Sequence, residues 1–253
     1  MPVIYKKYGE IVEITQIEKT PRPRKVRVYT ARRRRDVYGL RRPDNIRRTK
    51  QICVRRVFSA LEEYGCPLLV TLTFAGDASD ASYANDSLRS FQVRLRTKYP
   101  LAQSLFIPEL SPRGRIHFHG LLFNVPLSLG DTRQGRRIIS HGNERKDRTL
   151  AKLWGEGYVD ATQTDGSGRL AHYISKYITK GGSHILFNAM RMLRISHGFP
   201  KEMVVRGDMA VELAKRYSDK KPFTEWTRQS LFMGEITKKK YVTTTEKICA
   251  NPT

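Results

Sequence analysis

Several short stretches of the chain are apolar or alternate between apolar and polar residues, which is the pattern of β-strands. Pro67 to Phe74 is almost continuously apolar and bounded by turn residues, which predicts a central strand. Two further runs, residues 104–110 and 115–123, are separated by Ser111-Pro112-Arg113-Gly114. Residues 1–20 alternate weakly around Gly9 and predict a small hairpin.

Other segments carry apolar residues at helical spacing. One begins at Asp44, which we expect to cap it, and runs to Tyr64 before Gly65. A second ends at Tyr99, before Pro100, and Met209 to Tyr217 predicts a third. Pro126 to Arg148 is polar and predicts a loop inserted near the substrate, while Lys238-Lys239-Lys240 is interpreted as the start of a basic tail.

The strand at 115–123 carries His117 and His119 in alternation, so both imidazoles project from one face. Ile116, Phe118 and Leu122 then fill the other face. Two neighbouring imidazoles can form half of a metal site. The alternative is that they are two polar residues on the solvent-exposed face of an antiparallel sheet, which gives the same pattern.

The turn before this strand supplies a third ligand. If Pro112 to Gly114 is a three-residue loop, with glycine in the left-handed last position, Ser111 lies opposite Arg115. Counting back along one strand and forward along the other places Glu109 opposite His117. Two nitrogens and one carboxylate oxygen suit Mg²⁺ or Mn²⁺ better than a closed structural zinc site.

Charge points to a polyanionic partner. Lys and Arg number 47 against 24 Asp and Glu, a formal net charge of +23. No apolar run approaches the ~20 residues of a membrane-spanning helix and no signal peptide opens the chain, so we expect nucleic acid rather than membrane, and a cytoplasmic protein. The three cysteines are odd in number and contain no Cys-x-x-Cys pair, so we expect reduced thiols and no zinc ribbon.

Basic residues cluster in two places. The segment from Pro21 to Arg42 reads either as an arm that contacts phosphate or as a solvated tail. The polar face of the helix at 44–64 is equally open to both interpretations. We expect DNA contacts from the following side chains: Arg32, Arg33, Arg34, Arg35, Arg55, Arg56 and Lys180.

A further helix is predicted from Leu170 to Lys180, closed by Gly181-Gly182. Leu170, Ile174 and Ile178 form its core stripe, and an adjacent ridge carries Tyr173, Lys176, Tyr177 and Lys180. Tyrosines four residues apart are commonly packing residues. Beside a divalent ion, a tyrosine oxygen can instead attack a phosphodiester, and Lys176 would favour the phenolate or neutralise charge in the transition state.

Together these motifs resemble the HUH (His-hydrophobic-His) endonucleases that initiate rolling-circle replication, with the closest similarity to initiators of microvirus-type single-stranded DNA phages. The matching residues are Thr71-Leu72-Thr73-Phe74, Glu109, His117-Phe118-His119 and Tyr173-x-x-Lys176-Tyr177, together with Arg55-Arg56, Leu95-Arg96 and Trp154-Gly155. The resemblance covers roughly residues 45–182 and depends on the order and spacing of the motifs together.

The resemblance implies an α+β fold, with a central antiparallel sheet of the RRM-like type flanked by helices and the two histidines on a middle strand. It implies an endonuclease domain, which we place at 44–185. The basic arm that we expect at 1–43 and the C-terminal extension at 186–253 match no part of the family's pattern. It further implies nicking of single-stranded DNA at an origin, a 5′-phosphotyrosine intermediate on Tyr173 or Tyr177, and later rejoining of the strand.

The chain contains no G-x-x-x-x-G-K-[ST] phosphate loop, so we expect a separate host helicase to unwind DNA and a polymerase to extend the nicked strand. No small molecule beyond the metal is implied, and a phage-encoded protein would act in the bacterial cytoplasm. Two alternatives stay open: an HUH transposase or plasmid relaxase with the same chemistry, and a basic nucleic-acid-binding protein without catalysis.

Overall fold

The computed structural model describes residues 1–19, 42–76, 78–126, 132–134, 137–141, 149–181 and 190–243. These residues form two compact units, a larger one within residues 42–199 and a smaller one that joins residues 1–19 to 200–243. In the part of the chain so described, no helix has the length and apolar character needed to cross a membrane.

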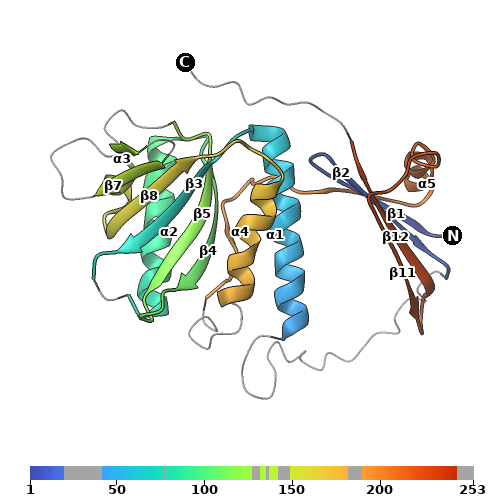
Figure 1. The fold of residues 1–253 in the computed structure, drawn as a ribbon, viewed down its shortest axis with the longest axis horizontal. Helices are drawn as coiled ribbons and strands as arrows, with labels where there is room; N and C mark the ends of the chain where they lie inside the picture. The colour runs from blue at the N-terminus through green and yellow to red at the C-terminus, as the bar shows by residue number, and fades with distance from the viewer. Residues whose placement is uncertain are drawn as a thin grey trace. The chain divides into compact units, whose positions relative to one another are not determined.

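An antiparallel seven-stranded sheet forms the centre of the larger unit (Figure 1), with the order β6-β7-β8-β3-β5-β4-β9. Its strands are β3 (Leu68–Phe74), β4 (Gln103–Leu110), β5 (Ile116–Phe123), β6 (Thr132–Gln134), β7 (Arg137–His141), β8 (Gly157–Gln163) and β9 (Arg194–Ile195). The histidine strand β5 lies inside the sheet, between β3 and β4.

Helices cover both faces of this sheet. They are α1 (Pro43–Tyr64), α2 (Ala81–Lys98), α3 (Thr149–Trp154) and α4 (Arg169–Gly181). One face packs against α2 and α3, and the other packs against α1 and α4, which lie side by side (Figure 1). The predicted α+β fold with a central antiparallel sheet flanked by helices is confirmed.

The alternation of strand residues explains why two cores form. Phe118 and Leu122 of β5 are buried in the core beneath α2, whereas Leu121 and Phe123 are buried in the core beneath α4. Trp154 is fully buried in the first core, and its indole N–H donates a hydrogen bond to the Thr73 carbonyl over 3.1 Å. This face-by-face division leaves the polar residues of β5 on the α1 and α4 side.

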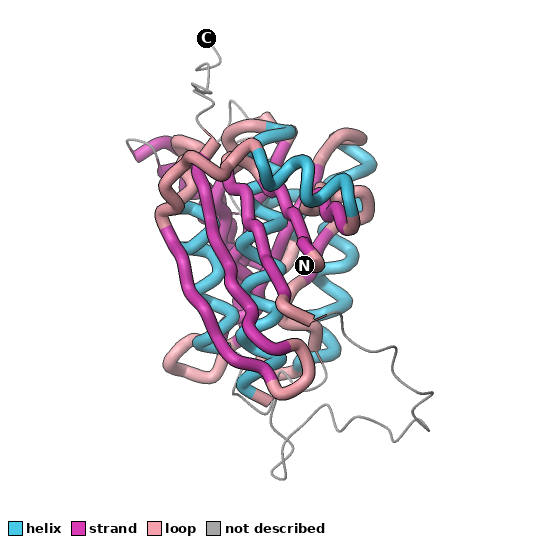
Figure 2. Tube along the Cα trace, turned by 90° about the vertical axis from the view of Figure 1, so that its right-hand side faces the viewer, coloured by secondary structure: helices cyan, strands magenta, loops and turns pink. Residues whose placement is uncertain are grey.

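The smaller unit is a five-stranded antiparallel sheet with the order β10-β1-β2-β12-β11. Its elements are β1 (Val3–Tyr8), β2 (Ile11–Ile17), β10 (Met203–Arg206), α5 (Asp208–Lys215), β11 (Thr224–Ser230) and β12 (Gly234–Val242). Helix α5 lies across one face of this sheet (Figure 2), and its apolar residues pack against those of the strands. The hairpin expected near Gly9 is therefore present, as two inner strands.

Several expectations from the sequence change. The ends expected to be a separate arm (1–43) and extension (186–253) contribute described strands to one sheet, because β2 pairs with β12 and β1 pairs with β10. Lys238 to Lys240 lie within β12 and do not begin a tail. The polar segment 126–148 contains strands β6 and β7, so its interpretation as a loop is wrong for those residues.

Two local details also differ. The residue that precedes α1 is Arg42, and Pro43 occupies the first turn, so Asp44 is not the cap; its carboxylate pairs instead with the Arg47 guanidinium at 3.1 Å. Cys53 is a buried free thiol as expected, whereas Cys66 is disulfide-bonded.

Gly120 is the point at which β5 tolerates no side chain. A methyl group there would overlap the buried Phe106 ring and approach the Leu105 carbonyl oxygen to 2.8 Å. We expect Gly120→Ala to lower the free energy of unfolding by about 1–3 kcal/mol, as overpacked cores do. Gly76, which has open space around its Cα, is the matched control. Denaturant unfolding that found the two alanine variants equally stable would contradict this packing.

Candidate active site

The loop between β4 and β5 has the predicted geometry. The Ser111 N–H donates to the Arg115 carbonyl, and the Gly114 N–H donates to the Ser111 carbonyl, each over 2.9 Å. Gly114 has φ 76°, the left-handed conformation expected of it. The strands therefore pair with Glu109 opposite His117, which confirms the predicted register.

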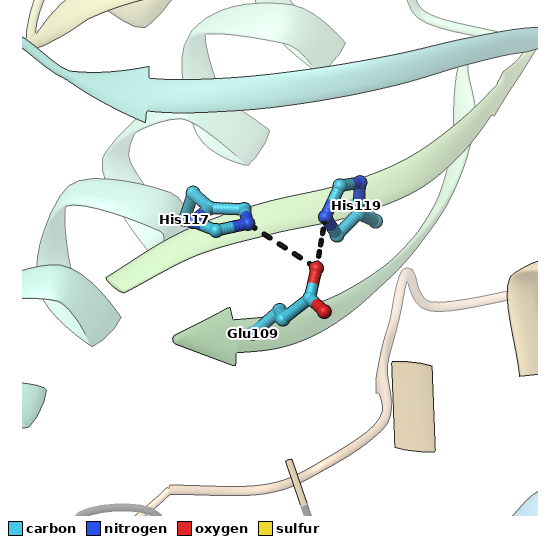
Figure 3. A group of neighbouring side chains, drawn as sticks. All are labelled: Glu109, His117 and His119. Atoms are coloured by element: carbon cyan, nitrogen blue, oxygen red, sulfur yellow. Dashed lines mark hydrogen bonds and ion pairs between the residues drawn. The ribbon is translucent and has the colours of Figure 1, made fainter. Parts of the chain in front are cut away.

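The three predicted ligands meet on one face of the sheet (Figure 3). Glu109 Oε2 lies 2.7 Å from His119 Nε2 and 3.3 Å from His117 Nε2. The candidate ligand atoms of all three residues lie within 4.8 Å of one another. Each side chain is largely covered, with 13–17% of its surface exposed. Two imidazoles and one carboxylate in this arrangement form a group that can hold a divalent metal ion.

The surroundings of these ligands favour their metal-binding protonation states. Burial lowers the pKa of His119 to about 4, and the neighbouring His117 contributes to this shift, so the ring stays neutral and keeps a lone pair at neutral pH. Burial alone would raise the pKa of Glu109, but His119 and Lys180 outweigh it and hold that pKa below its usual value. The site therefore offers a carboxylate and a neutral imidazole.

Thr71 on β3 orients one of the histidines. It lies opposite His119, and its Oγ1 is 3.1 Å from His119 Nδ1. When Nε2 faces a metal ion, Nδ1–H donates to this hydroxyl, which fixes the tautomer and the ring plane. The sequence analysis placed Thr71 in the Thr71-Leu72-Thr73-Phe74 motif and assigned it no role of its own. The signal that could have found this contact is the pairing of β3 with β5.

Helix α4 brings both tyrosines to this metal-binding group. The Tyr177 ring stacks on the His119 ring with centroids 3.7 Å apart, and the Tyr173 and Tyr177 hydroxyls form a hydrogen bond of 2.9 Å. Leu170, Ile174 and Ile178 are buried against the sheet, as their spacing predicted. Burial, the hydrogen bond to Tyr173 and the Glu109 charge raise the pKa of Tyr177.

The two lysines of α4 occupy different places. Lys180 Nζ lies 3.3 Å from Glu109 Oε1, so this residue, predicted only as a DNA contact, also forms an ion pair with a candidate metal ligand. Lys176 is exposed, and its Nζ lies 5.9 Å from the centre of the Tyr173 ring. Lys176 therefore lies near Tyr173, the tyrosine beside which the sequence placed it.

Two of the predicted DNA-binding arginines, Arg55 and Arg56, are described by the structure and lie on α1. Arg55 and Arg56 are half-buried, and the Arg56 guanidinium donates to the Phe199 carbonyl over 2.8 Å. That bond connects α1 to the end of the larger unit and gives Arg56 a structural role beside any contact with DNA. The remaining arginines fall outside the described residues: Arg32, Arg33, Arg34 and Arg35.

Comparison with known proteins gives one family. Residues 67–182, just under half of the chain, match the family model described as Replication-associated protein ORF2/G2P. No curated protein and no solved structure matches the chain. The matched segment runs from the start of β3 to the end of α4 and so contains the metal-binding group and both tyrosines. It supports a replication initiator of the rolling-circle type, and the microvirus similarity stays a prediction.

Replacing Thr71 by valine should weaken metal binding without removing a ligand. Loss of a hydrogen bond to a ligating histidine costs about 10–100-fold in metal affinity, and we expect Thr71→Val to fall in that range for Mn²⁺ measured by calorimetry. Thr73→Val is the matched control, because among the described residues the Thr73 hydroxyl bonds neither histidine. Equal Mn²⁺ affinities for the two variants would contradict the role of Thr71.

The protonation of His119 gives a second test. In metal-free protein we expect its ring to titrate with a midpoint of about pH 4, well below the ordinary histidine value of about 6.5. The unfolded chain takes up this proton first, so the free energy of unfolding should fall as pH drops from about 6.5 towards 4. Imidazole NMR measures the midpoint. A His119 midpoint near 6.5 would mean that the ring is solvated.

Proposed function

We propose that this protein is a rolling-circle replication initiator that nicks single-stranded DNA at an origin and later rejoins the strand. The observation that carries the proposal is that the two tyrosines of α4 lie next to the candidate metal ligands. The Tyr177 ring stacks on His119 of the Glu109, His117 and His119 group, and its hydroxyl is hydrogen-bonded to that of Tyr173. The family match of residues 67–182 supports replication initiation above transposition or plasmid transfer.

Glu109, His117 and His119 would hold Mg²⁺ or Mn²⁺, which would polarise the scissile phosphate. Lys180 stands beside Glu109 and Lys176 beside Tyr173, so two cations are close to any phosphate bound between α4 and the histidines. These charges favour a phosphorane-like transition state, in which negative charge builds on the phosphate oxygens.

The proposed reaction exchanges one phosphodiester for another. A tyrosine oxygen attacks the phosphorus and loses its proton, the P–O3′ bond breaks, and the 3′ oxygen takes up a proton as it leaves. The products are a 5′-phosphotyrosine and a free 3′ hydroxyl that a polymerase can extend. In the reverse step a 3′ hydroxyl attacks the phosphotyrosine, and the tyrosine leaves with its proton restored.

Two tyrosines at one site allow two such transfers to alternate. We infer that Tyr173 acts first, because it is 43% exposed, has Lys176 beside it, and shares the hydrogen bond with a neighbour whose pKa is raised. Tyr177 is held against His119 by stacking, and its pKa is raised by burial and by its hydrogen bond to Tyr173, so we assign it the second transfer.

The positive charge of the chain supports a DNA partner, and its phosphate contacts would make affinity fall as salt rises. The larger unit carries no phosphate loop in its sequence, so a host helicase would supply unwinding and a host polymerase would extend the 3′ end. The site of action would be the bacterial cytoplasm if a phage encodes the protein.

Phenylalanine variants test the two tyrosines. We expect Tyr173→Phe to lower formation of the covalent adduct on an origin oligonucleotide by more than about 10³-fold, as loss of a nucleophile does in other enzymes. Tyr177→Phe should keep the adduct and impair the second transfer, which is read out as circularisation. Adduct yield is measured by intact-protein mass spectrometry.

Tyr158→Phe is the matched control for these variants. Tyr158 is 49% exposed on β8 and pairs with Thr73, the residue that also pairs with His117, so it shares the face of the site. It lies outside the bonded tyrosine pair, and its variant should keep both transfers. Equal adduct yields from Tyr173→Phe and Tyr177→Phe, with loss only in the double variant, would overturn the proposed order of the tyrosines.

A further inference from the structure

Trp226 gives the smaller unit an exposed aromatic surface. It lies on β11, the edge strand of the five-stranded sheet, and 38% of its surface is exposed. Its cross-strand neighbour is Lys238 of β12. The other tryptophan of the chain, Trp154, is fully buried in the larger unit.

Two cations flank the Trp226 ring. Lys238 Nζ lies 5.3 Å from the ring centre, and the Arg228 guanidinium carbon lies 5.7 Å from it. Arg228 follows Trp226 by two residues on the same strand, so both side chains project from one face. We call Trp226, Arg228 and Lys238 together the Trp226 platform. Such an arrangement offers a flat ring for stacking and charges for a phosphate backbone.

The sheet face around the platform is strongly basic. Strand pairing puts five cations on this face against the single carboxylate of Glu13: Lys6, Arg206, Arg228, Lys238 and Lys240. Glu13 is only 2% exposed, and Lys6, Lys238 and Lys240 surround it at 3.0–3.9 Å. One carboxylate thus holds three lysines in place and leaves an excess of positive charge on the face opposite α5.

We propose that the Trp226 platform binds single-stranded DNA, with a base stacked on Trp226 and the flanking phosphates held by Arg228 and neighbouring lysines. The platform belongs to the smaller unit and lies outside the matched residues 67–182, so it would be a DNA contact made by residues other than those of the proposed nicking site. The choice of DNA as the polyanion rests on the proposed function. The stacking surface favours single strands, because the faces of paired bases inside a duplex are already stacked.

The two tryptophans make the proposal directly measurable. We expect an oligothymidylate of about 16 nucleotides, a length that covers such a surface, to quench tryptophan fluorescence of the chelated full-length protein. Trp226→Phe should remove this quenching, since buried Trp154 has no access to a base. Trp226→Ala should weaken the affinity about tenfold, the effect expected from losing one stacked base.

Phe223→Ala is the matched control. Phe223 is an exposed aromatic next to β11, and its N–H bonds to the Lys240 carbonyl; it lies three residues from Trp226 and so on the opposite side of the strand. Its variant should bind oligothymidylate as the wild type does. Trp226→Ala should still nick a short origin oligonucleotide at saturating concentration. Loss of nicking in the wild type would therefore count against the proposed function, whereas unchanged oligothymidylate affinity in Trp226→Ala would count against the platform.

Three outcomes would overturn the proposal. The first is undiminished quenching in Trp226→Phe, and the second is wild-type affinity in Trp226→Ala. The third is that the protein binds single-stranded and duplex DNA with equal affinity and that neither affinity depends on Trp226. The basic face would then contact phosphates without stacking on a base.

Discussion

Glu109 lies opposite His117 because a three-residue loop joins their strands and fixes the pairing register. Side chains on a strand alternate between faces, so a slip of one residue would turn both histidines into the core beneath α2 and expose Phe118. Burial of Phe118 on one face and of Leu121 and Phe123 on the other therefore specifies the register. The same packing that stabilises the sheet brings Glu109, His117 and His119 together as a candidate metal-binding group.

Helix α4 depends on the same constraint. Its apolar residues enter the core that Leu105, Ile107 and Leu121 of the sheet form, and this burial sets the rotation of the helix. Tyr177 then stacks on His119, and Lys180 reaches Glu109. The proposed nucleophiles and the candidate metal ligands thus come from separate elements, each fixed by apolar packing.

The sequence predicted what depends on local geometry. The loop length placed Glu109, the strand period placed His117 and His119, and the helical period separated Tyr173 from the buried Ile174. It did not predict the stacking of Tyr177 on His119 or the ion pair of Lys180 with Glu109, because these contacts depend on how α4 packs across the sheet.

Long-range strand pairing was equally hidden from the sequence. Lys238 to Lys240 read as a tail because three consecutive lysines obscure the alternation of a strand. In the structure Lys238 and Lys240 bind Glu13 on one face, while Lys239 pairs with Glu225 on the other. The pairing of β2 with β12 joins residues at opposite ends of the chain, and no local pattern indicates it.

The polarity of strand attachment tests the central claim most directly. A single-stranded origin oligonucleotide is labelled at either its 5′ or its 3′ end, nicked by the protein in the presence of Mn²⁺, and resolved on a denaturing gel. Attack by a tyrosine predicts that the 3′-labelled fragment, which carries the new 5′ phosphate, migrates with the protein, while the 5′-labelled fragment runs free with a 3′ hydroxyl. Release of both fragments, or attachment of the 5′-labelled one, would contradict the account.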